Sequence, residues 1–278
     1  MTFSPSQTAP SPHALQPHAA EAEQTMVAAP LTASSTTGRR GVLVALVGCD
    51  GSGKSTLSRQ LIQILNHPSQ EGGGLVPVRH PVRYGYLGQG SGDLGRKIAA
   101  LPGVGGFLEK RIATRAKKAR TKGAKIPGFP TALVVFAFSL LRFKRFLKVR
   151  QQVEKGDFVI TDRYPQQEVP GHCDGPGLSA GYSRNPFVRG LAALERAWYG
   201  YMTSFKPDLV IFLDVDAERA VARKPDHDLE ALRTKAAIMP QLRFRGAARV
   251  VLDARKPLSE VRKAALEALM ARGLIKKL

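Results

Sequence analysis

The sequence predicts a three-layer α/β fold in which a parallel sheet is flanked by helices. Short apolar segments rich in β-branched residues alternate with longer segments of helical periodicity, a pattern typical of parallel strands joined by right-handed crossovers. The expected strands are 42–47, one within 75–87, 158–161, 208–213 and 250–252. The expected helices are 54–65, 131–154, 187–205, 217–222, 229–238 and 258–272.

The chain is expected to divide into a tail and one domain. Residues 1–40 are rich in Pro, Ser, Thr, Ala and Gln, and their few acidic and basic side chains cancel. Such a segment cannot bury enough apolar surface to offset its ordering entropy, so we expect a disordered N-terminal tail. Residues 41–278 suit a single domain. Within it, residues 88–130 are basic and punctuated by Gly and Pro, which indicates an irregular insertion with a helix near 107–120.

The net charge is +20, and much of it lies in residues 96–155, where sixteen Lys and Arg residues face only Glu109 and Glu154. Such a surface attracts polyanions, for example nucleic acid, an anionic membrane or an acidic saccharide. No nucleic-acid-binding motif or interleaved aromatic residues accompany the charge. We therefore favour a nucleotide site on a generally basic, solvated surface over a polyanion-binding patch.

Cysteine content and hydropathy bear on the compartment. Two cysteines, Cys49 and Cys173, are no disulfide framework, so a reducing cytoplasm is the expected location. The apolar run 131–141 is too short to span a bilayer, and basic residues follow it at once. It is more typical of a core helix.

The most specific motif is the octapeptide 48–55 (GCDGSGKS), which matches the phosphate-binding pattern G-x-x-x-x-G-K-[ST] between an expected strand and an expected helix. Glycines let the backbone wrap a phosphate, and inward N–H groups and the helix N-terminus favour its negative charge. Lys54 is expected to reach the β- and γ-phosphates of ATP, and the Ser55 hydroxyl to bind Mg²⁺. The motif predicts a P-loop NTPase fold whose ATP site consists of Gly48, Asp50, Gly51, Ser52, Gly53, Lys54, Ser55 and Thr56.

Four segments together resemble the thymidylate kinase group of P-loop nucleoside monophosphate kinases, over about residues 41–275. They are the loop 48–56, the strand end Asp162-Arg163-Tyr164, the segment 207–215 with Arg223-Lys224 after a short helix, and 251–254 before the last helix. The resemblance implies ATP- and Mg²⁺-dependent phosphoryl transfer to a small-molecule acceptor, with dTMP as the default. Members of that group often form dimers, so a homodimer is a further expectation.

Phosphoryl transfer requires in-line positioning and positive charge around the moving group, which suggests roles for the remaining residues. Arg163 can bind the acceptor phosphate, and Asp162 either orients Arg163 or binds Mg²⁺ through water. Arg223 is expected to close over the transferring phosphate from a shortened lid. The resemblance implies that Asp50 faces the acceptor's sugar and that Tyr164 and Arg142 contact the acceptor, although Arg142 also fits a solvated basic face.

The elements that recognise thymine in that group are missing. Residues 165–177 replace the stretch that packs on thymine, and residues 84–88 (YGYLG) stand near the place of an expected Arg-Glu-Pro. Three hypotheses follow, in decreasing order of preference. The first is a nucleoside monophosphate kinase, and the second is a kinase of the same fold for a nucleoside, sugar or sugar phosphate linked to polysaccharide biosynthesis. The third is a nucleotide-binding regulatory or scaffolding protein that contacts a polyanion or a membrane surface through residues 96–155.

Overall fold

The structure, a computed structural model, describes residues 40–68, 74–79, 81–89, 128–225 and 227–277. The expected tail, apart from Arg40, lies outside the described residues. So do the helix expected near 107–120 and most of the basic insertion.

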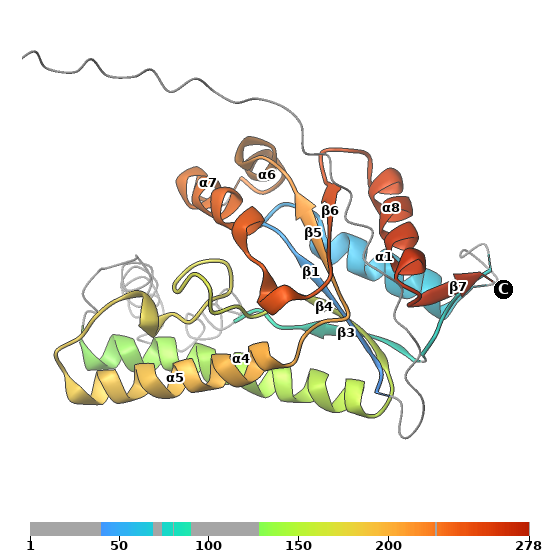
Figure 1. Ribbon diagram of the computed structural model, residues 1–278. Coiled ribbons are helices and arrows are strands. Elements are labelled where there is room, and N and C mark those ends of the chain that lie inside the picture. The colour runs from blue at the N-terminus through green and yellow to red at the C-terminus, as the bar shows by residue number, and fades with distance from the viewer. Residues whose placement is uncertain (1–39, 69–73, 80, 90–127, 226, 278) are drawn as a thin grey trace, which may run out of the picture.

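A five-stranded parallel sheet forms the centre of the domain, in the spatial order β3-β4-β1-β5-β6 (Figure 1). The strands are β1 (Val42–Val47), β3 (Val82–Tyr86), β4 (Phe158–Asp162), β5 (Leu209–Asp214) and β6 (Arg249–Asp253). Every residue of β1 is buried, as is typical of a central parallel strand that is covered on both faces.

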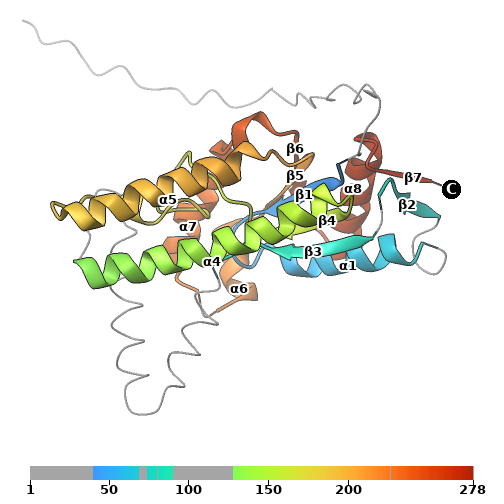
Figure 2. The same cartoon turned by 90° about the horizontal axis from the view of Figure 1, so that it is seen from below.

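Helices cover both faces of this sheet, which confirms the predicted α/β fold. Alternate residues of β1 enter two separate hydrophobic cores. The first core is closed by α1 (Lys54–Asn66) and α8 (Leu258–Ala271), and the second by α4 (Phe129–Glu154) and α5 (Pro186–Ser204). Figure 2 shows α4 and α5 side by side, extending beyond the sheet.

Two short helices follow β5, namely α6 (Ala217–Arg223) and α7 (Leu229–Ile238). The Asp216 carboxylate caps α6 by accepting a 2.7 Å hydrogen bond from the Arg219 backbone N–H. Single 3-10 turns complete the chain at η1 (Leu178–Ala180), η2 (Met239–Gln241) and η3 (Phe244–Gly246).

The segment 75–87 forms two strands rather than one. Its first part, β2 (Leu75–Pro77), leaves the main sheet and pairs antiparallel with β7 (Ile275–Lys277), a strand that the sequence pattern did not reveal. Pro77 and Pro81 cannot donate backbone hydrogen bonds, so a continuous strand through this segment would lose ladder bonds. The other elements expected within the described residues are present, with ends shifted by at most two residues.

β1 lies between β4 and β5, so the loops that leave the carboxyl ends of these three strands open on the same edge of the sheet. In parallel sheets of this kind, ligands bind at that edge. None of the helices in the described ranges has the length and apolar character that a bilayer crossing requires.

Candidate functional site

The phosphate-binding loop 48–53 joins β1 to α1, as the motif predicts. Gly48, Gly51 and Gly53 have φ angles of 149°, 86° and 92°, which residues other than glycine rarely adopt. A Cβ atom on Gly51 would also lie 2.4 Å from the Ala220 carbonyl oxygen, because α6 packs against the loop. The first N–H groups of α1 have no partners within the helix, so the loop ends at a site that favours an anion.

Lys54, the first residue of α1, folds its buried side chain back over the loop. Its Nζ donates hydrogen bonds to the carbonyl oxygens of Gly48 at 3.0 Å and Cys49 at 2.7 Å, and lies 3.5 Å from Ser52 Oγ. Burial lowers the pKa of Lys54, and the nearby charge of Arg163 lowers it further. Among the described residues no carboxylate forms an ion pair with Lys54, so its ammonium can turn toward a phosphate.

Ser55 and Asp162 meet beside the loop, although they are far apart in the sequence. The Ser55 hydroxyl donates a 2.8 Å hydrogen bond to Asp162 Oδ2. The other carboxylate oxygen, Oδ1, is buried and has no hydrogen-bond partner in the described part of the chain. An orphaned carboxylate oxygen next to a hydroxyl suits Mg²⁺, which is held in such sites by one or two protein oxygens together with water and substrate phosphates. The described residues contain no cluster of three or more His, Cys, Asp or Glu side chains that would bind a metal without such a substrate.

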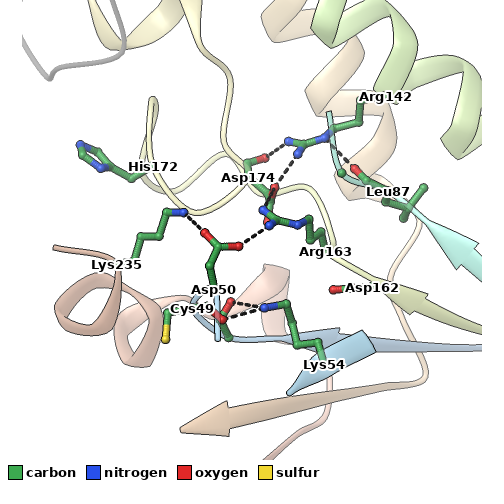
Figure 3. Close-up of polar contacts among 12 residues, drawn as sticks. Cys49, Asp50, Lys54, Leu87, Arg142, Asp162, Arg163, His172, Asp174 and Lys235 are labelled. Atoms are coloured by element: carbon green, nitrogen blue, oxygen red, sulfur yellow. Dashed lines mark hydrogen bonds and ion pairs between the residues drawn. The ribbon is translucent and has the colours of Figure 1, made fainter. Parts of the chain in front are cut away.

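A chain of alternating charges runs from the loop toward α4 (Figure 3). Asp50 of the loop is buried, and its two oxygens accept hydrogen bonds from Arg163 and from Lys235 of α7. Arg163 Nη1 lies 3.7 Å from Asp174 Oδ1. Asp174 in turn accepts a 2.5 Å hydrogen bond from Arg142.

The cations decide the ionisation of both aspartates. Burial on its own would raise the pKa of Asp50, but the charges of Arg163, Lys235 and Lys54 outweigh it and hold the pKa below its ordinary value. Burial opposes ionisation of Asp174 in the same way, and the charges of Arg142 and Arg163 again lower the pKa overall. Both carboxylates are therefore charged at neutral pH, and together they compensate part of the positive charge.

Sequence reasoning missed Lys235 and Asp174. Lys235 lies on a short helix whose orientation depends on how α6 and α7 pack, and no sequence motif marks it. Asp174 lies in the turn-rich segment 165–177, where an aspartate is ordinarily a turn residue. The region that was expected to supply Arg223 as a lid cation also brings Lys235 to the loop.

Arg223 and Tyr164 stand apart from this charged chain. The Arg223 guanidinium donates to the carbonyl oxygen of Ala254 at 3.0 Å and reaches that of Gly51 at 3.5 Å, so it braces the loop from the α6 side. Tyr164 is only 2 % exposed, and its hydroxyl donates to the carbonyl oxygen of Phe205 at the end of α5. Tyr164 is enclosed in the second core, so its side chain packs there, and its expected contact with an acceptor stays a prediction.

Arg142 is corrected in one respect. It is 1 % exposed rather than part of a solvated basic face, and each of its three nitrogens has a partner. Nε donates to the Leu87 carbonyl oxygen at 2.8 Å, and Nη1 donates to the Asp174 carbonyl oxygen at 2.6 Å and the Tyr199 hydroxyl at 2.9 Å. Arg142 therefore holds Asp174 in place, and its expected contact with an acceptor stays a prediction. Of the other expected residues, Ser52 is buried beside Lys54, and Thr56 is exposed on the first turn of α1.

Comparison with known proteins places the chain in a family. It is 40% identical over 230 residues to the "Uncharacterized ATP-binding protein YghS" of Escherichia coli (strain K12), which covers 82% of this chain and 92% of that protein. It is 37% identical over 220 residues to the "Uncharacterized ATP-binding protein YghR" of the same strain, 79% of this chain and 83% of the relative. The chain belongs to the family of YghS and YghR.

More distant relatives agree with this assignment. The thymidylate kinase of Caenorhabditis elegans is 29% identical over 211 residues, which is 74% of this chain and 79% of that enzyme. No protein-family model matches the chain. With the loop geometry described above, these similarities make the YghS and YghR family P-loop kinase-like.

Proposed function

We propose that this protein transfers the γ-phosphoryl group of Mg·ATP to a phosphorylated small-molecule acceptor, and that a nucleoside monophosphate, with dTMP first, is the acceptor to test. The observation that carries the proposal is the convergence of Lys54, the Ser55–Asp162 pair and Arg163 at one edge of the sheet. The names of the ATP-binding relatives and the similarity to thymidylate kinases support the same chemistry.

The loop side of the site suits the phosphate donor. Lys54 exchanges its carbonyl partners for the β- and γ-phosphates, and the N-terminus of α1 adds partial positive charge. Ser55 and Asp162 would hold Mg²⁺, which neutralises charge on the phosphates when it is bound. Since Asp162 already orients the Ser55 hydroxyl, these two oxygens need little rearrangement to act as metal ligands.

Arg163 and Lys235, the two cations paired with Asp50, form a side of the site that suits the acceptor. The side chains of Arg163 and Lys235 are 30% and 31% exposed, whereas the Asp50 side chain that joins them is 8% exposed. These two partly exposed cations present positive charge to an incoming anion. The Asp50 carboxylate that holds them is buried, so it does not face that anion. An acceptor that carries a phosphate dianion fits this arrangement better than a neutral alcohol does.

The identity of the acceptor beyond its phosphate is less constrained. The segment 165–177 is occupied by its own contacts, among them Gln166 Nε2 with the carbonyl oxygens of Val169 and His172. Arg142 and Tyr164, which the resemblance offered as acceptor contacts, are buried. These observations favour a second candidate, a kinase of the same fold whose acceptor is a sugar phosphate.

The test is an ADP-release assay with Mg·ATP and a panel of dTMP, dUMP, other nucleoside monophosphates, nucleosides and sugar phosphates. Lys54→Met and Arg163→Ala should each lower turnover at least about a hundredfold, the scale of losing a charge contact to the transition state. Arg83→Ala, which removes an exposed arginine paired with Asp157 just before β4 begins, at the opposite edge of the sheet, is the matched control and should be unchanged.

Two results would contradict the proposal. Turnover with neutral nucleosides or sugars alone would refute a phosphorylated acceptor. Tight ATP binding without turnover across the whole panel would favour the regulatory, nucleotide-binding alternative.

A further inference from the structure

Arg163 is held from two sides by carboxylates that belong to different loops. Its Nη2 donates to Asp50 Oδ1 in the phosphate-binding loop, and its Nη1 lies 3.7 Å from Asp174 Oδ1 in the segment that follows β4. We infer that Asp50, Asp174 and Arg142 form a guanidinium socket, in which Asp174 and Arg142 are positioning residues that fix Arg163 toward the acceptor. The role of Arg163 toward an acceptor rests on the proposed function, but the socket itself does not.

The backbone of Arg163 shows why such a socket is needed. Its φ is 67°, in the left-handed region that residues other than glycine seldom occupy. Strain of this kind persists where the surrounding structure over-determines the conformation, and it is concentrated at functional sites. A long arginine side chain that leaves such a backbone has many rotamers, so partners on one side alone would leave it mobile.

Asp174 can fix Arg163 because Asp174 is itself immobile. Arg142 donates two hydrogen bonds to it, from Nη2 to the side-chain Oδ1 at 2.5 Å and from Nη1 to the backbone carbonyl oxygen at 2.6 Å. The side chain of Arg142 is 2% exposed, and its Nε donates to the Leu87 carbonyl oxygen just beyond β3. The socket thus ties the ends of β3 and β4 to the middle of α4.

The segment that carries Asp174 is braced along its length. Gly171 N–H donates to the Pro176 carbonyl oxygen at 2.9 Å, and Gly175 N–H donates to that of His172 at 2.8 Å. At its far end, the buried Glu195 of α5 accepts the backbone N–H groups of Gly177 and Leu178. These bonds fix the position of the Asp174 carboxylate before any ligand arrives.

The burial of Asp174 assigns it a positioning role. Its side chain is 12% exposed, and its carboxylate pairs with the guanidinium groups of Arg142 and Arg163. A carboxylate between two arginines would repel an incoming phosphate if it faced it. It therefore acts by orienting Arg163, whose side chain keeps 30% of its surface exposed.

Chemical rescue tests the socket without any need for turnover. In Arg163→Gly the two carboxylates remain, so free guanidinium at millimolar concentration should bind between them and raise the melting temperature in a saturable way. The expected rise is about 3–6 °C at tenfold over the dissociation constant. The rise should disappear in Arg163→Gly with Asp174→Asn. Sodium chloride at equal ionic strength, and Arg255→Gly beside the exposed Asp253, are the matched controls and should give no rise.

The outcomes separate the socket from the proposed function. Saturable stabilisation that depends on Asp174 supports the socket even if no acceptor is ever turned over. Equal stabilisation with and without Asp174, or none in Arg163→Gly, overturns it, even if the wild type proves to be an active kinase. If an acceptor is found, guanidinium should restore turnover of Arg163→Gly only when Asp174 is intact.

A second measurement covers the case in which Arg163→Gly fails to fold. Rotation of the Arg163 guanidinium about its Nε–Cζ bond can be followed by NMR in protein with labelled arginine. Rotation should be slow in the wild type and at least about tenfold faster in Asp174→Asn, because one of the two flanking negative charges is lost. Asp253→Asn should leave it unchanged, and an unchanged rate in Asp174→Asn would overturn the inference.

Discussion

The contact between the phosphate-binding loop and α6 predicts that two similar glycine substitutions will differ in cost. Gly51 and Gly53 are two residues apart, and both have positive φ angles, 86° and 92°. A Cβ atom on Gly53 would meet no atom within 4 Å, whereas one on Gly51 would lie 2.4 Å from the Ala220 carbonyl oxygen. Gly51→Ala and Gly53→Ala therefore share the backbone strain, and only the first adds a clash with backbone.

The magnitudes follow from these two terms. Placing a residue with a Cβ atom in a left-handed conformation costs about 1–2 kcal/mol, which applies to both variants. Overpacking against a rigid neighbour adds about 1–3 kcal/mol. We expect Gly53→Ala to lower the free energy of unfolding by about 1–2 kcal/mol and Gly51→Ala by about 2–5 kcal/mol. For a domain of this size each kcal/mol corresponds to about 2–4 °C in melting temperature.

Urea unfolding of the nucleotide-free protein measures both costs while avoiding any effect of the substitutions on ligand affinity. Nucleotide must be absent because a phosphate bound by the loop would approach the open space beside Gly53. Equal losses for the two variants, or a larger loss for Gly53→Ala, would refute the packing of α6 against Gly51.

Three further predictions concern the site and its supports. Lys54→Met should weaken ATP binding in calorimetry at least about tenfold, since the buried ammonium loses its phosphate partner; unchanged affinity would place the phosphates elsewhere. Glu195→Ala should lower the free energy of unfolding by about 2–4 kcal/mol, because the Ser139 hydroxyl at 2.5 Å and two backbone N–H groups lose their acceptor; a loss below about 1 kcal/mol in urea unfolding would contradict this. Since the folded-state pKa values of Asp50 and Asp174 lie below those of the unfolded chain, their stabilisation is complete above about pH 4 and is lost as the pH falls further. Asp174→Asn should therefore lose stability less steeply below about pH 4, and an unchanged slope in unfolding titrations would be evidence against its ionisation.

The main sheet could be predicted from the sequence because its signals are local. Each central strand is a short run of apolar residues buried on both faces, and each crossover helix has its own apolar periodicity. The β2–β7 pair could not be predicted in this way. Its strands are three residues long, and they gain stability only by pairing across most of the chain.

The candidate site likewise has a part that local sequence signals predict and a part that depends on long-range packing. The phosphate-binding loop is contiguous in sequence, so its residue types and spacing reveal its chemistry directly. The meeting of Ser55 with Asp162 could also be expected, because strand ends of a parallel sheet share an edge. The burial of Arg142 and Tyr164 could not be predicted, because residue type and approximate position carry no information about burial.

The residue pattern is enough to predict the fold class, the phosphate-binding loop and the strand-end residues, since each depends on neighbours within one strand–loop–helix unit. Which charges meet depends on how distant elements pack. Lys235 reaches Asp50 because α7 folds back over the loop, and Asp174 reaches Arg163 because Arg142 holds it from α4. Electrostatic partners are chosen by distance and burial in three dimensions, and neither quantity is encoded in the local pattern of residues.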